Sequence, residues 1–169
     1  MKAAGIVLAL ALALAVQTTL GRFAARGSMV VDLVLVVVVY VALTLGPVAG
    51  LLTGTVAGLL QDALSSGVIG IGGLAKTIVG FLTGIVGSQF IVSQSLPRFV
   101  VFFGATALHA VVFMGLYIVL DLRHFGTPYA AVATQGVGNA VVGVLAFQLV
   151  ELLPGAVERR RAARGRLRR

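Results

Sequence analysis

Six apolar runs account for most of this chain, and each is about as long as a helix that crosses a lipid bilayer. Such a helix needs about 20 mainly apolar residues. The runs lie near residues 3–20, 29–45, 47–64, 73–92, 98–120 and 128–151. Of all residues, 59% are hydrophobic and 11% are charged, and the mean hydropathy is +1.10. This composition is far from that of a soluble domain. The sequence therefore predicts an all-α integral membrane protein, with six transmembrane helices in one compact bundle over residues 1–153.

Local sequence refines this layout. Gly46-Pro47 is the tightest break between two runs, because proline suits the first turn of a new helix. The valines at 36–39 are expected to face lipid. Lys2 and the apolar stretch after it could instead form a cleaved signal peptide, but an even number of spans keeps both charged ends on one side.

The positive charge is concentrated at the C-terminus, in the segment 154–169. The formal net charge is +8, and seven arginines follow Pro154. They are Arg159, Arg160, Arg161, Arg164, Arg166, Arg168 and Arg169. A basic cluster beyond a spanning helix is typical of a cytoplasmic tail on anionic lipid, and nucleic acid is the weaker alternative.

The other basic residues indicate the orientation of the bundle. With both termini in the cytoplasm, Lys2, Arg98 and the tail lie inside, and Arg22, Arg26 and Arg123 lie outside. The positive-inside rule favours this arrangement, with nine basic residues inside and three outside.

Small residues recur every four positions along the third and fourth runs. The third run carries Gly46, Gly50, Gly54 and Gly58, and the fourth carries Gly80, Gly84 and Ser88. Because small residues let helix backbones approach closely, these rows predict an antiparallel hairpin that packs face to face. We expect this hairpin to form the internal core and the first, second or sixth run to remain available to partners.

Each row of small residues also contains a charged residue. Asp62 ends the first row and Lys76 begins the second, at the same level of the hairpin. Charged side chains inside a membrane need a partner or water, so we expect an intramembrane ion pair between these two residues. Both a structural and a functional role are compatible with such a pair.

Five other polar residues are candidates for an outward-facing pocket, with Gln17 as a further member. They are Gln61, Thr77, His109, Gln135 and Asn139. The alternative is hydrogen bonding between helices. The chain has no cysteine, and its other histidine, His124, falls in a loop, so we expect no metal site and no cofactor. The sequence lacks the common catalytic motifs, which argues against an enzyme.

The hairpin resembles the signature of the MreD family of rod shape-determining proteins. The matching residues are Gly46-Pro47, Gly50, Gly54, Gly58, Gln61-Asp62, Gly67, Gly70, Leu74-Ala75-Lys76 and Gly80. The rest of the chain agrees in size, six-span layout and hydropathy.

The resemblance implies a non-enzymatic subunit of the cell-elongation complex in the bacterial inner membrane, helping to position or regulate peptidoglycan synthesis. The implied partner is an MreC-like single-span protein, which links the complex to MreB filaments and to the peptidoglycan polymerase and transpeptidase pair. The family is also similar in layout to the S components of energy-coupling factor transporters. A small-molecule-binding S component is therefore the alternative function.

Overall fold

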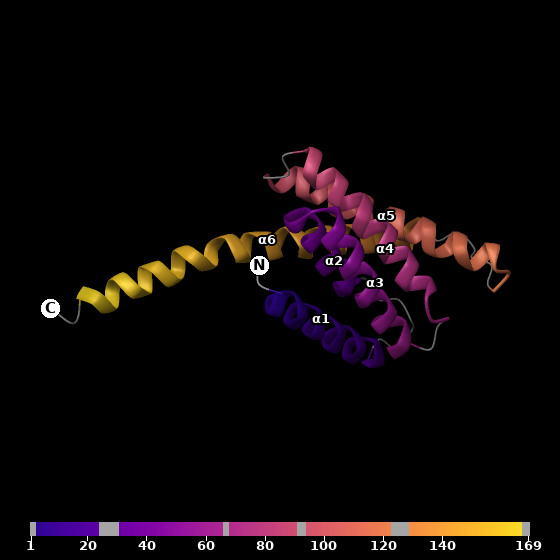
Figure 1. The fold of residues 1–169 in the computed structure, drawn as a ribbon, viewed down its shortest axis with the longest axis horizontal. Coiled ribbons are helices and arrows are strands. Elements are labelled where there is room, and N and C mark those ends of the chain that lie inside the picture. Colours follow the sequence, from indigo (N-terminus) through magenta and orange to yellow (C-terminus); the bar gives the residue numbers. More distant parts are fainter. Residues whose placement is uncertain (1–2, 24–30, 66–67, 91–93, 123–128, 167–169) are drawn as a thin grey trace.

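The computed structural model describes residues 3–23, 31–65, 68–90, 94–122 and 129–166, without the side chains of 20–23 and 153–166. Within these ranges all regular structure is helical, which confirms the all-α part of the predicted class. Six helices follow one another along the chain (Figure 1): α1 (Ala3–Phe23), α2 (Leu33–Leu45), α3 (Pro47–Leu64), α4 (Ile71–Gln89), α5 (Ser95–Val119) and α6 (Tyr129–Arg166).

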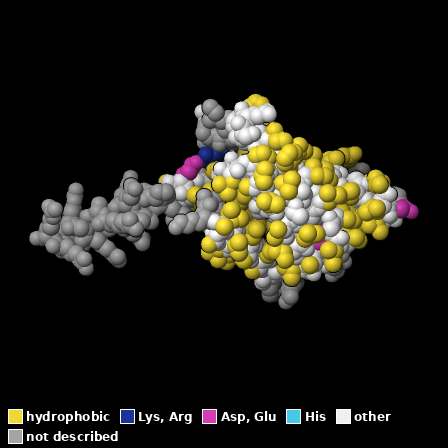
Figure 2. All heavy atoms as spheres, viewed as in Figure 1, with side chains coloured by type: hydrophobic (Ala, Val, Ile, Leu, Met, Phe, Trp, Pro, Cys, Tyr) yellow, Lys and Arg dark blue, Asp and Glu magenta, His cyan; other side chains and the backbone are white. Residues whose placement is uncertain are grey.

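Four of these helices are long and apolar enough to cross a membrane. They are α3, α4, α5 and the part of α6 from Tyr129 to Leu152. The apolar part of α1, Ala3–Thr19, and the whole of α2 are shorter. The face seen in Figure 2 is mostly hydrophobic, with few charged side chains. Such a surface suits contact with lipid.

Helix α2 lies in the centre of the bundle, contrary to the expectation that it is available to partners. Seven of its residues are buried. The valines at 36, 38 and 39 are at most 5% exposed, so the prediction that the run 36–39 faces lipid is wrong. These valines pack into two apolar clusters, one against α4, α5 and α6 and the other against α1 and α3. A helix surrounded in this way is apolar all round, as the sequence of α2 is.

The predicted hairpin of α3 and α4 is present, and its glycines bring the two backbones into contact. A Cβ atom on Gly50 would overlap the backbone of Gly80, and one on Gly54 would overlap the backbone of Lys76. Gly58 lies in the same way against Gly73. The rows of small residues therefore pack face to face, as expected from their spacing.

At the ends of the two rows of small residues, the contacts differ from those in the middle. Gly84 packs against Pro47. Gly46 instead ends α2 with a φ of 91°, a conformation that favours glycine, and Pro47 begins α3. Ser88 is exposed, and its hydroxyl donates to the carbonyl of Ile85 in its own helix. The packing role predicted for Ser88 is therefore wrong, because at this point α4 has passed Pro47, the first residue of α3.

Two helix ends differ most from the predicted spans. Helix α2 begins at Leu33, because Asp32 caps it, and not near 29. Helix α6 continues as one helix to Arg166, past the predicted end at 151. Its final part leads away from the bundle (Figure 1). The side chains of the basic tail lie outside the described residues.

Candidate functional site

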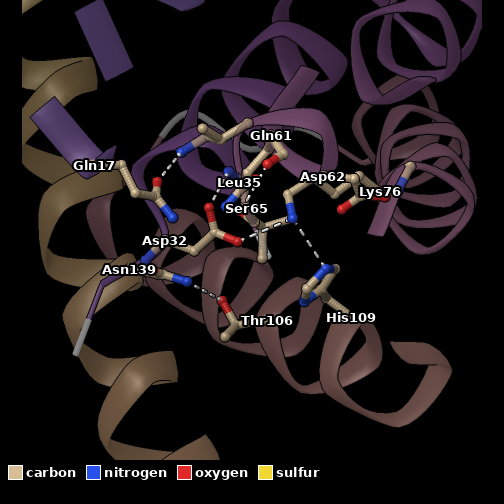
Figure 3. A network of polar contacts seen from close by, with 12 residues as sticks. Gln17, Asp32, Leu35, Gln61, Asp62, Ser65, Lys76, Thr106, His109 and Asn139 are labelled. Atoms are coloured by element: carbon tan, nitrogen blue, oxygen red, sulfur yellow. Dashed lines mark hydrogen bonds and ion pairs between the residues drawn. The ribbon is translucent and has the colours of Figure 1, made fainter. Parts of the chain in front are cut away.

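The main polar feature of the bundle is a buried network around Asp32, the residue that caps α2 (Figure 3). Asp32 is 5% exposed. Its Oδ1 accepts a hydrogen bond from the backbone N–H of Leu35 at 3.0 Å. Aspartate is a favoured helix N-cap because its carboxylate satisfies free N–H groups of the first turn and lies at the positive end of the helix dipole.

The carboxylate of Asp32 also holds the amino group of Lys76 from α4. Lys76 Nζ lies 3.1 Å from Asp32 Oδ2, and both side chains are almost fully buried. On its other side, Lys76 Nζ lies 3.2 Å from Nε2 of His109 on α5. An ammonium group only donates hydrogen bonds, so His109 Nε2 accepts and the imidazole is neutral. The three side chains thus carry one positive and one negative charge.

Two more helices reach the start of α2 through amide side chains. On α6, Asn139 accepts from the backbone N–H of Asp32 at 2.8 Å and donates to the hydroxyl of Thr106 on α5 at 3.0 Å. On α1, the side-chain oxygen of Gln17 accepts from the N–H of Val34 at 3.2 Å. The first turn of α2 is therefore satisfied by side chains from its own cap and from two other helices.

Asp62 has a different role from the one predicted. Its Oδ2 accepts from the backbone N–H groups of Gly70 and Gly73, at 2.9 and 3.0 Å. The carboxylate thus closes the loop between α3 and α4 and caps the first turn of α4, where a negative charge is stabilised.

The predicted ion pair between Asp62 and Lys76 is therefore wrong. The backbone of Lys76 is pressed against Gly54 of α3, as the overlap of a Cβ on Gly54 indicates. No space remains for the lysine side chain on the α3 side. It extends instead toward α2 and α5, where Asp32 and His109 lie.

The five residues proposed for an outward pocket make different contacts. His109 and Asn139 belong to the network around Asp32. The Thr77 hydroxyl donates to the carbonyl of Gly73 and lies 2.8 Å from the hydroxyl of Thr55. The side-chain oxygen of Gln61 is buried without a hydrogen bond in the described part of the chain, and Gln135 is half-buried one turn before Asn139. Hydrogen bonding between helices, the alternative interpretation, describes Thr77, His109 and Asn139.

The sequence interpretation missed Asp32, Thr106 and Arg98 as members of polar contacts. Asp32 immediately precedes the apolar run at 33–45, which is the usual sequence signal of an N-cap. Arg98 of α5 pairs with Glu151 of α6, and its guanidinium lies 4.3 Å from the ring centre of Phe147. This second contact lies near the start of α5, about three turns before His109.

Comparison with family models decides the identity of the chain. A model described as rod shape-determining protein MreD matches residues 3–154. The chain belongs to the MreD family. Members of this family are membrane proteins that determine rod shape, and MreD is not a known enzyme family. Comparison with curated proteins and with solved structures gave no match, so the likeness in layout to S components stays a prediction.

The arrangement in this MreD family member joins five helices at one point. The network contains side chains from α1, α4, α5 and α6 together with the cap of α2. Thr106 lies near the middle of α5, and Asn139 lies near the middle of the apolar part of α6. Buried polar contacts at this depth have no water to replace them, so they favour one relative position of the helices.

Proposed function

We propose that this chain is a non-enzymatic subunit of the bacterial cell-elongation complex, which binds an MreC-like single-span protein. Through that partner it connects to MreB filaments and to the peptidoglycan polymerase and transpeptidase pair, and so helps to position or regulate wall synthesis. The observation that carries the proposal is the match to the MreD family over residues 3–154.

The structure supports a scaffold role through its division into a fixed interior and an apolar exterior. Helix α2 is enclosed, and the network around Asp32 joins it to four other helices. Large apolar side chains on α1, including Leu8 and Leu12, remain more than half exposed. A partner helix in the same membrane would pack against such outer faces, because most of α2 is buried.

We also propose that the chain lies in the bacterial inner membrane with both termini in the cytoplasm. The Arg98–Glu151 pair supports this arrangement, because it brings the start of α5 and the end of the apolar part of α6 to one end of the bundle. The basic tail then lies on the cytoplasmic surface, where it contacts anionic lipid.

A pull-down of the tagged, full-length chain from bacterial membranes tests the partner. We expect recovery of an MreC-like protein, and depletion of the chain should convert rods to rounded cells. Wild type and Gly104→Ala should restore rods, since a Cβ on Gly104 meets nothing within 4 Å. Recovery of the ATPase subunits of an energy-coupling factor transporter, without an MreC-like protein, would instead support the S-component function.

A further inference from the structure

The long apolar helices of this bundle fall into a shorter pair and a longer pair. Helix α3 has 18 residues and α4 has 19, so they are about 27 and 28 Å long. Helix α5 has 25 residues and the apolar part of α6 has 24, which gives about 37 and 36 Å. The far end of α5 reaches beyond the other helices at the right of Figure 1. The hydrocarbon core of a bilayer is about 30 Å thick, a value between the two pairs.

Helices α2 and α6 run in the same direction, and their contacts give a common register. The backbone N–H of Asp32 donates to the side chain of Asn139 at 2.8 Å. Eight residues further along each helix, the ring centres of Tyr40 and Phe147 lie 4.4 Å apart. Equal steps along the two helices thus lead from one contact to the next. Positions equally far from Asp32 and from Asn139 therefore lie at one level.

This register aligns the bundle at its cytoplasmic end and not at its outer end. Gly46 ends α2 about 21 Å beyond the level of Asp32, and Leu152 ends the apolar part of α6 about 20 Å beyond it. Helix α3 begins directly after Gly46 and returns by about 27 Å to Leu64. The apolar part of α6 covers about 36 Å back to Tyr129. Helix α3 therefore stops about 9 Å short of the outer end of α6.

The side chains at the two outer ends are those expected at a membrane boundary. On α3, the exposed Leu64 is followed by the exposed, polar Ser65. On the longer side, Val119 at the end of α5 is 82% exposed and Tyr129 at the start of α6 is 78% exposed. Tyrosine is enriched where a helix meets the membrane surface. Apolar side chains thus continue on α5 and α6 beyond the level at which α3 has become polar.

The two heights are mismatched with an ordinary bilayer in opposite directions. A helix shorter than the hydrocarbon core thins the bilayer, and a longer one tilts or thickens it. Tilt alone would have to incline α6 by about 40° against an upright α3, which is the upper limit for transmembrane helices. We propose that the bundle presents two hydrophobic thicknesses, and that it favours short-chain phospholipid beside α3 and long-chain phospholipid beside α5 and α6 in the outer leaflet. The inference rests on the proposed membrane location.

Tryptophan fluorescence tests the two faces separately, because the sequence contains no tryptophan. Val56→Trp on α3 and Val137→Trp on α6 are matched, since both residues are about half exposed and lie eight residues from the outer end of their helix. The whole chain is reconstituted in brominated dioleoyl phosphatidylcholine, which quenches tryptophan beside it. Dimyristoleoyl phosphatidylcholine, with short chains, or dierucoyl phosphatidylcholine, with long chains, is mixed in as competitor.

We expect the short-chain competitor to relieve quenching more effectively in Val56→Trp, and the long-chain competitor in Val137→Trp. The ratio of the two competitor affinities should differ about threefold between these variants. Leu60→Trp and Ala133→Trp, at exposed positions four residues from the same outer ends, repeat the comparison with a second pair of variants.

The cytoplasmic side provides the control. Leu52→Trp on α3 and Leu149→Trp on α6 also change exposed residues, and they lie toward the ends that share one level. Their affinity ratios should therefore agree.

Equal affinity ratios in Val56→Trp and Val137→Trp would overturn the proposal, because both faces would then select the same lipid. A difference between Leu52→Trp and Leu149→Trp as large as that between the outer variants would also overturn it, since the outer ends would not be the cause. Absence of quenching in every variant would instead overturn the proposed membrane location.

Discussion

Lys76 places a positive charge in the interior of the bundle, and Asp32 is its counter-ion. Both side chains are almost fully buried, so neither can exchange its partner for water. Removal of one member of such a pair leaves an uncompensated buried charge, which typically costs about 3–5 kcal/mol. Replacement of both members by neutral groups costs much less.

This asymmetry predicts the outcome of a double-mutant cycle. Lys76→Met should lower the free energy of unfolding by about 3–5 kcal/mol, because the Asp32 charge loses its partner. Adding Asp32→Asn should recover much of this loss, since asparagine is also a good N-cap. The measurement is reversible unfolding of the purified protein in mixed micelles.

A double-mutant cycle of Asp62 and Lys76 serves as the control. Asp62→Asn and Lys76→Met should act additively, because Asp62 bonds to Gly70 and Gly73 and not to Lys76. A large coupling energy for residues 62 and 76, with none for 32 and 76, would contradict the contacts described for this network.

His109 accepts a hydrogen bond from the buried ammonium group of Lys76. A substitution that removes this acceptor leaves a buried charged donor short of a partner, which typically costs about 1–3 kcal/mol. His109→Leu should therefore lower the free energy of unfolding by about this amount, measured by reversible unfolding in mixed micelles.

His109→Gln is the matched variant. It should keep most of the stability, because its amide oxygen can still accept from Lys76. Equal losses in the two variants would argue against this hydrogen bond.

At the scale of the helices, the closest contact is that between α3 and α4. Gly54→Ala should lower the free energy of unfolding by about 1–3 kcal/mol, because the new methyl group would overlap the backbone of Lys76. Gly104→Ala on α5 is the control and should be neutral or stabilising by up to about 1 kcal/mol, since its surroundings are open. Equal effects of the two changes would argue against tight packing at Gly54.

The sequence predicted the helices well because each apolar run ends at a recognisable break. The bounds of α3 agree with the prediction, and α4 and α5 differ by a few residues. The position of α2 was not predictable from its valines, since lipid and protein interior are both apolar and select the same side chains. The buried polar residues beside α2 indicate its central position only when their hydrogen-bond partners are known.

For the polar network, the sequence identified several members but not their connections. Lys76, His109 and Asn139 stand out in apolar helices, and Gln17 was a further candidate. Spacing along a hairpin gives the level of a residue but not the direction of its side chain, and the contact of Lys76 with Gly54 decides that direction. Asp32 was missed because it falls at the edge of an apolar run.

At the scale of the whole molecule, the absence of cysteine from the sequence allows a direct test of orientation. Single cysteines at two exposed positions, Ser65→Cys after α3 and Gln94→Cys before α5, have no background thiol. With both termini in the cytoplasm, a membrane-impermeant maleimide should label Ser65→Cys in intact cells and Gln94→Cys only after lysis. The reverse pattern would invert the proposed orientation.

The short length of α2 has a consequence for biogenesis. The helix has 13 residues and rises about 20 Å, and its first turn lies among polar groups from α1, α4, α5 and α6. During synthesis, α2 leaves the ribosome long before Asn139, which receives the N–H of Asp32. The network around the start of α2 can therefore be completed only after α6 has been made.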